Sequence, residues 1–174
     1  MMIISLNNII NSIKIATKVL SKFPNLNMII NNIRPVNLNL LTEWILENEF
    51  FYVILKSRFN GSFSGKILTI MDMASCDELI NNITGKHIKV LNDYEKSILQ
   101  EFFNIFIGAF LANYTNEYIN YEIPEISILT SYEIIKEIND DWKIFKIGCD
   151  RPIISILLLL NIENYSRKNN ELNS

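Results

Sequence analysis

The segment from Ser97 to Phe110 constrains the fold most, because apolar residues surround most of the helix that it predicts. Their helical spacing continues from a start at which Asn92 and Glu95 predict a capping box. A helix that is apolar over most of its surface must be largely covered by other elements. We therefore expect a long, mostly buried helix that ends near Asn116.

This helix also carries one narrow polar stripe. At an advance of about 100° per residue, Ser97, Glu101, Asn104 and Gly108 fall within about 60° of one another. Two interpretations remain open from the geometry. The stripe is either the solvent-facing side of the helix or a surface that presents a functional site.

The composition favours one cytoplasmic domain. The 174 residues, 49% of them hydrophobic, are enough for a single core over 1–164, followed by a polar tail at 165–174. The net charge of −3 leaves no basic field for nucleic acid. The N-terminus does not resemble a secretory signal, and the apolar runs are too short to cross a bilayer, so no membrane insertion is expected.

The few residues that could hold a metal or form a disulfide do not have the spacing for either. Cys76 and Cys149 are too few for a disulfide framework, and with the single His87 they give no zinc-ligand pattern. We expect two inert thiols in a reducing compartment and no metal site.

Periodicity and turn residues predict a similar series of elements in each half of the chain. The first half is expected to contain a helix over 5–23, a strand over 27–36, a short helix or irregular connection over 38–46, and strands over 49–59 and 62–71 joined by a turn at Asn60-Gly61. A capping box from Ser75 to Glu78 predicts a short helix that Gly85 ends in the left-handed conformation. After the long helix we expect a strand over 122–130, a short helix or turn over 131–138, and strands over 141–149 and 152–162 joined by Asp150-Arg151.

The shared order of elements indicates an internal duplication. Each half reads as a long helix, a strand, a short connection and two adjacent strands. We therefore predict an α+β fold built from a duplicated α-β-β-β unit, in which two long helices cover an antiparallel-rich sheet.

The polar stripe and its surroundings resemble the signature of the CheC/CheX family of chemotaxis phosphatases. That signature has Asp or Ser, three residues, Glu, two residues and Asn, with a later proline, and Ser97, Glu101, Asn104 and Pro124 are similar to it. Glycines at further family positions are matched by Gly61, Gly65, Gly85 and Gly108. The resemblance covers about residues 5–160.

The resemblance implies a phosphatase that removes phosphate from the aspartyl phosphate of a CheY-type response regulator. Glu101 would contact a lysine of the receiver domain, and Asn104 would orient the attacking water. Ser97 and Gly108 would lie at the partner interface. The family needs no cofactor of its own, because Mg²⁺ belongs to the receiver. Edge pairing between subunits, as in CheX dimers, makes a homodimer compatible with the fold.

Two positions depart from the family pattern. The first helix has Asn8-Ile-Ile-Asn11 where the CheC branch usually has a second Glu-x-x-Asn, which suggests a single site as in the CheX branch. Phe103 stands where a glycine commonly precedes the catalytic asparagine. Its ring would either enter the core or obstruct the partner.

Two other interpretations remain open. The chain could be a non-catalytic CheC/FliM-like module that binds a receiver domain or a flagellar switch component, since the middle domain of FliM has the same fold. It could also be an unrelated α+β domain whose polar stripe faces only solvent.

Overall fold

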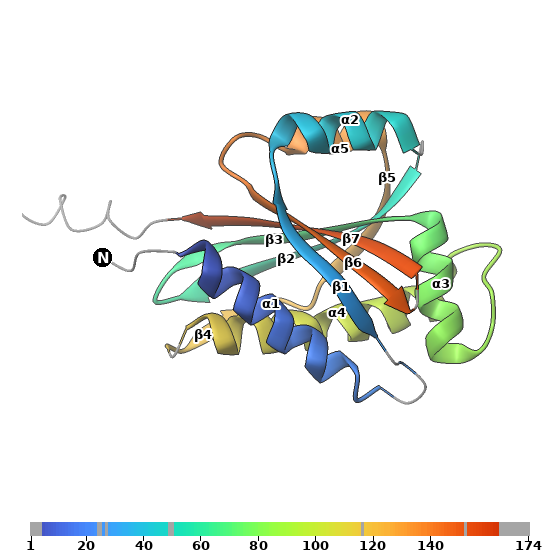
Figure 1. Cartoon of the computed structure of the whole chain (residues 1–174), viewed down its shortest axis with the longest axis horizontal. Coiled ribbons are helices and arrows are strands. Elements are labelled where there is room, and N and C mark those ends of the chain that lie inside the picture. Colours follow the sequence, from blue (N-terminus) through green and yellow to red (C-terminus); the bar gives the residue numbers. More distant parts are fainter. Residues whose placement is uncertain are drawn as a thin grey trace, which may run out of the picture.

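A single antiparallel sheet runs through the molecule (Figure 1). The computed structural model describes residues 5–23, 26, 28–48, 51–115, 117–151 and 153–163, so the predicted tail at 165–174 lies outside the described residues. Within this part the strands are β1 (Ile29–Val36), β2 (Phe51–Gly61), β3 (Ser64–Asp72), β4 (Ile119–Tyr121), β5 (Glu125–Thr130), β6 (Lys143–Arg151) and β7 (Ile153–Glu163). Their order is β1-β6-β7-β3-β2-β4, and β5 also pairs with β2.

The outer strand of each half of the chain pairs with a strand of the other half, an arrangement called strand exchange below. β1 of the first half pairs with β6 of the second, with Val36 opposite Ile144. In the equivalent pairing, β5 of the second half pairs with β2 of the first, with Phe51 opposite Thr130. β3 and β7 meet in the centre. With β4 left aside, the order β1-β6-β7-β3-β2-β5 becomes its own reverse when the halves are interchanged, which confirms the predicted duplication.

Helices cover both faces of the sheet. α1 (Leu6–Leu20) and α4 (Asp93–Tyr114) lie side by side on one face, as predicted for the two long helices (Figure 1). α2 (Leu38–Asn48) and α5 (Ser131–Glu137) cover part of the other face, and α3 (Met73–Thr84) joins the halves at one end of the sheet. The segments at 38–48 and 131–137, for which the sequence left a helix or an irregular connection open, are both helical.

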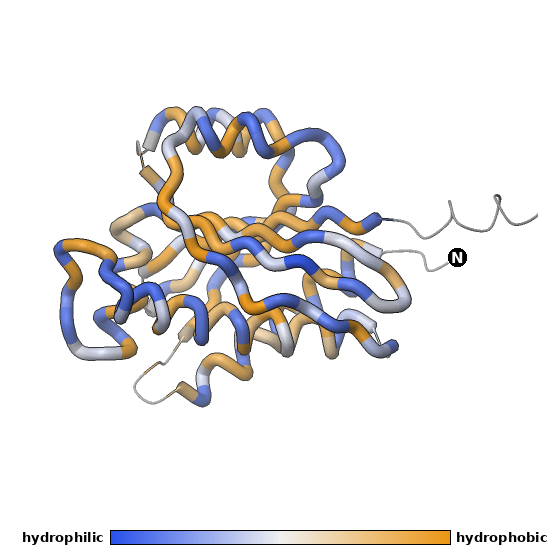
Figure 2. The backbone as a smooth tube through the Cα atoms, turned by 180° about the vertical axis from the view of Figure 1, so that it is seen from behind, coloured by the Kyte–Doolittle hydropathy of each residue, from blue (hydrophilic) through white to orange (hydrophobic). Residues whose placement is uncertain are grey.

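The central strands are apolar on both faces because each face has its own core. In β7, Leu158 and Leu160 belong to the core under α1 and α4, whereas Leu157 and Leu159 belong to the core under α2 and α5. A strand covered on both sides shows no alternation of polar residues. Figure 2 shows the resulting concentration of hydrophobic residues in the middle of the sheet. The apolar run at 153–160 is thus explained by its central position.

The hairpin between β2 and β3 is confirmed, but its predicted turn at Asn60-Gly61 is wrong. Asn60 and Gly61 continue β2 and pair with Asn120 and Ile119 of β4, so the bend falls at Ser62 and Phe63. The local turn signal is overridden because β4 offers β2 further pairing beyond its register with β3. The predicted strand at 122–130 is shorter in the structure, where β5 covers 125–130, and a separate short strand, β4 at 119–121, precedes it.

The start of α3 also differs from the prediction, whereas its end agrees. The N-cap is Asp72, whose side chain accepts a hydrogen bond from the Ser75 N–H at 2.6 Å. Ser75 is buried inside the helix, and its Oγ accepts from the N–H of Ser155 at 3.0 Å. Gly85 ends the helix with φ +74°, the left-handed conformation expected of it. Among the described helices, none is both long and apolar enough to span a membrane.

Candidate functional site on α4

The N-terminus of α4 is fixed by the predicted capping box. The Asn92 side chain accepts hydrogen bonds from the N–H groups of Tyr94 at 2.9 Å and Glu95 at 3.4 Å. The Glu95 carboxylate in turn accepts from the Asn92 N–H at 3.1 Å. These bonds satisfy donors that an uncapped helix end would leave without partners. The start of the helix, and hence the direction of each later side chain, follows from the local sequence.

Burial divides α4 into a core side and an outer side. The residues that face the core are Leu99, Phe102, Phe103, Phe106, Ile107, Phe110, Leu111 and Tyr114. On the outer side Ser97 and Glu101 are exposed, and Asn104 and Gly108 are half-buried. The structure therefore brings all four predicted residues together along one side of the helix.

The side chains of Glu101 and Asn104 are available to an external partner. They lie about one turn apart, and within the described part of the chain neither has a hydrogen-bond or ion-pair partner. Only the main-chain carbonyl of Asn104 accepts a hydrogen bond, from the hydroxyl of Tyr121 at 3.4 Å. An unpaired carboxylate and an unpaired carboxamide can therefore act together on a group that approaches this side of the helix.

Ser97 has a local partner for its hydroxyl. Its Oγ donates to the carbonyls of Asp93 and Tyr94, at 2.9 Å in each case. This geometry is common for serine within a helix. A contact of Ser97 with a partner remains a prediction, in which its oxygen would act as acceptor.

The ring of Phe103 enters the core. Its side chain is 1% exposed, and its ring lies at a centroid distance of 5.0 Å from Phe102 and 6.2 Å from Phe106, both in edge-to-face arrangement. Of the two alternatives for this position, the structure selects burial. The residue before Asn104 therefore does not obstruct the outer surface.

Tyr121 of β4 is a neighbour of the site that the sequence did not indicate. Its phenol end packs on Gly108, and its hydroxyl reaches the carbonyl of Asn104. Gly108 thus has an intramolecular neighbour, besides the partner contact predicted for it. A glycine inside an apolar helix signals room for a close approach, but the sequence does not say which residue uses that room.

The corresponding surface of α1 lacks an acidic residue. Asn8 and Asn11 are both exposed on α1, beside α4 on the same face of the sheet. The duplicated half therefore offers two amides and no carboxylate at these positions. This agrees with a single Glu/Asn pair, on α4.

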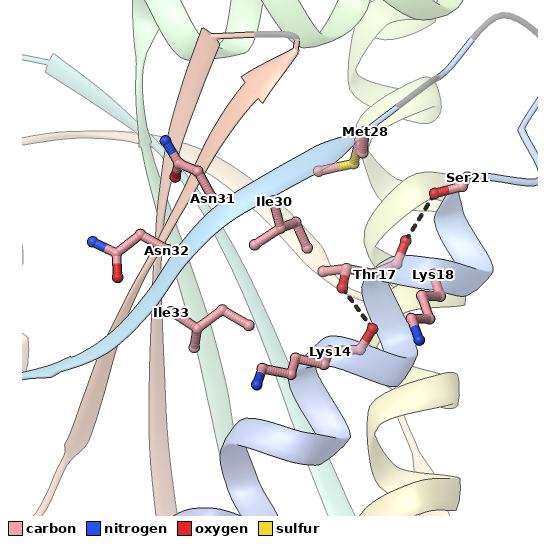
Figure 3. Close-up of a pocket in the computed structure, with 9 residues that line it drawn as sticks. All are labelled: Lys14, Thr17, Lys18, Ser21, Met28, Ile30, Asn31, Asn32 and Ile33. Atoms are coloured by element: carbon pink, nitrogen blue, oxygen red, sulfur yellow. Dashed lines mark hydrogen bonds between the residues drawn. The ribbon is translucent and has the colours of Figure 1, made fainter.

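A pocket of about 340 Å³ lies elsewhere, between α1 and β1 (Figure 3). Lys14 and Lys18 of α1 and Ile30 and Ile33 of β1 are among its lining residues. None of the four residues of the α4 stripe lines it. The pocket is therefore separate from the predicted site.

The titratable core residues do not form a second reactive centre. Burial raises the pKa of Cys76 to about 12, with further increases from Asp77 and Asp72. Burial, followed by Asp150, also raises the pKa of Cys149 to about 12. Within the described residues, no three His, Cys, Asp or Glu side chains gather as metal ligands would.

The fold has clear relatives among solved structures, although sequence comparisons find none. No protein-family model and no curated protein sequence matches the chain. The structure matches the CheX–CheY–BeF₃–Mg²⁺ complex of Borrelia burgdorferi, with 15% identity, a TM-score of 0.62 and coverage of 92% of this chain and 99% of that one.

Two further matches broaden the comparison. A CheC-like superfamily protein from Shewanella matches with 12% identity, a TM-score of 0.59 and coverage of 94% and 100%. The middle domain of FliM from Vibrio alginolyticus matches with 12% identity, a TM-score of 0.52 and coverage of 89% and 94%. Identities this low establish the architecture alone. The chain has the CheC/CheX-like fold.

Proposed function

We propose that this protein hydrolyses the aspartyl phosphate of a CheY-type receiver domain. One observation carries the proposal: the side chains of Glu101 and Asn104, which have no hydrogen-bond or ion-pair partner among the described residues, lie together on the outer side of α4. The fold supports it, since a structurally similar chain was crystallised as a CheX–CheY complex with beryllium fluoride and Mg²⁺. The buried ring of Phe103 supports it further by leaving the approach to Asn104 open.

Hydrolysis of an aspartyl phosphate requires little from the enzyme beyond the positioning of the attacking water. Phosphoryl transfer has a loose transition state that requires an in-line nucleophile and neutralised charge on the phosphoryl oxygens. Mg²⁺ bound by the receiver would supply the charge. The Asn104 carboxamide oxygen would accept a hydrogen bond from the attacking water, while its NH₂ group donates to a phosphoryl oxygen. Orientation of this kind is worth up to several kcal/mol, enough for one side chain to accelerate the reaction markedly.

Glu101 would serve the docking step. Its exposed carboxylate lies one turn before Asn104, where it can pair with a cation beside the receiver's phosphorylation site. Charge-assisted contacts of this kind are stronger than neutral hydrogen bonds when the partner excludes water. Glu101 thus acts on affinity, and Asn104 on the chemical step.

The test is phosphate release from a receiver of the same organism charged with acetyl phosphate. We expect the wild-type protein to accelerate release and Asn104→Ala to lose that acceleration without a change in the unfolding midpoint, because the side chain makes no hydrogen bond to the residues that the structure describes. Glu101→Ala should raise KM more than it lowers kcat. Asn113→Ala is the matched control, since Asn113 is an exposed asparagine of α4 that lies outside the polar stripe. Full activity of a folded Asn104→Ala variant would contradict the proposed site.

A second candidate function is a non-catalytic module that binds a receiver or a flagellar switch component. The similarity to the FliM middle domain and the missing carboxylate on α1 favour it. Here the wild-type protein would bind the phosphorylated receiver without accelerating phosphate release. Glu101→Ala would then weaken binding, and Asn104→Ala would leave the rate of release unchanged.

A further inference from the structure

The backbone around Tyr121 is held in place from two sides. Tyr121 pairs with Phe59 of β2, and the next residue, Glu122, donates its N–H to the Arg58 carbonyl at 2.9 Å. The Glu122 carbonyl accepts from the buried hydroxyl of Ser57 at 2.6 Å. From the other side, Gln100 of α4 donates its Nε2 to the carbonyl of Pro124 at 2.9 Å. The Tyr121 side chain therefore projects from a fixed main chain.

The phenol of Tyr121 occupies the space that the missing side chain of Gly108 leaves on α4. A Cβ at Gly108 would lie 3.2 Å from the Tyr121 Cζ and would overlap the hydroxyl oxygen. The hydrogen bond to the Asn104 carbonyl is long at 3.4 Å, so ring packing contributes more than the hydroxyl. Tyr121 is 37% exposed, so part of its ring remains at the surface beside Asn104.

We propose that Tyr121 is a positioning residue for Asn104, an inference that rests on the proposed phosphatase function. Residues four apart on a helix are neighbours, so a ring seated on Gly108 lies directly beside the Asn104 position. An asparagine that is only half-buried and has no side-chain hydrogen bond can sample several staggered χ1 rotamers and a broad χ2 range. The ring reduces the space for this motion and excludes water from one side. The carboxamide is then held ready to orient the attacking water, without help from the partner.

The first test separates positioning from partner contact. In the receiver assay, Tyr121→Ala should lower kcat by about tenfold and change KM by less than about threefold, because a less ordered carboxamide affects the chemical step. Tyr121→Phe should retain most of the wild-type kcat, since it keeps the ring. Tyr132→Ala is the matched control, because Tyr132 is an exposed tyrosine of α5 on the opposite face of the sheet. It should leave both constants unchanged.

The second test uses Gly108. Gly108→Ala should displace the phenol from the helix and lower kcat to a similar extent, while a better helix former at this position keeps the fold stable. In the Tyr121→Ala background the same substitution should cause no further loss. Such non-additivity is the signature of two residues that act through one contact.

The outcomes distinguish the two proposals. A wild-type protein that binds the receiver but releases no phosphate overturns the proposed function and this inference with it. Active wild-type protein with an unchanged kcat in Tyr121→Ala overturns this inference alone. So does an effect on KM only, which would make Tyr121 a partner contact, or a Tyr121→Phe variant as impaired as Tyr121→Ala. Matching unfolding midpoints exclude misfolding as the cause.

Discussion

Phe103 and Asn104 are adjacent in the chain, but Phe103 lies on the core side of α4 and Asn104 on its outer side. A turn of about 100° between them places the ring of Phe103 in the core and the carboxamide of Asn104 at the surface. The phenylalanine therefore anchors the helix, while the asparagine remains available. A site built in this way needs no loop, because the packing of the apolar side fixes the position of the polar one.

At the same scale, the buried cysteines predict an unreactive native protein. With both pKa values raised to about 12 by burial, almost no thiolate is present at pH 8. A thiol-specific reagent at pH 8 should therefore leave native Cys76 and Cys149 unmodified and label both after unfolding in guanidinium. The denatured sample is the control for reagent and protein concentration. Rapid, stoichiometric labelling of the folded protein would contradict the burial of these residues.

At the scale of single elements, the described helices differ in how their N-termini are capped. α4 and α5 have complete capping boxes, from Asn92 and Glu95 and from Thr130 and Glu133. α1 has only half of one. Ser5 accepts from the Asn8 N–H at 3.1 Å, but the residue at that third helical position is an asparagine rather than a glutamate. The start of α1 therefore lacks the second hydrogen bond of a capping box and is less stabilised than the starts of α4 and α5.

We expect Asn8→Glu to stabilise the protein. The new carboxylate can accept from the Ser5 N–H and lies in the first turn, where negative charge is favourable, so the gain should be about 0.5–1 kcal/mol. Urea unfolding measures the difference. Asn7→Glu is the control, since it places the same charge in the same turn without the capping position. Equal stabilisation by both variants would attribute the gain to charge alone.

Periodicity and capping signals were sufficient to predict most elements, and contacts between distant segments account for the errors. The polar stripe of α4 and its capping box follow from local geometry alone. The turn after β2 was misplaced because β4 pairs with Asn60 and Gly61, and the N-cap of α3 was misassigned because Ser75 bonds instead to Ser155. Tyr121 was missed for the same reason, since only the folded sheet brings β4 to Gly108.

At the scale of the whole molecule, the exchange of outer strands makes each half depend on the other. Without the second half, β1 has no β6, β2 has no β5, and α1 has no α4 beside it. A chain divided between Lys89 and Val90, both exposed in the connection between α3 and α4, should give two fragments that do not fold cooperatively alone. Mixed in equal amounts, they should regain the circular dichroism and thermal transition of the intact protein.

As a control, each fragment is mixed with a fragment of an unrelated α/β protein instead of its own partner. A cooperative thermal transition of residues 1–89 alone would contradict the dependence of one half on the other. Recovery of receiver binding on mixing would further indicate that the α4 surface forms only when both halves are present.

The strand exchange also determines when the protein can fold during its synthesis. The ribosome makes β1 early, yet its partner β6 begins only at Lys143. Until β6 and β7 have left the exit tunnel, β1 has no partner strand and β3 is paired only with β2, so α4 has only part of the sheet to pack on. The nascent chain must therefore expose strand edges from the synthesis of β1 until that of β6 and β7, a period in which such edges readily pair with other chains.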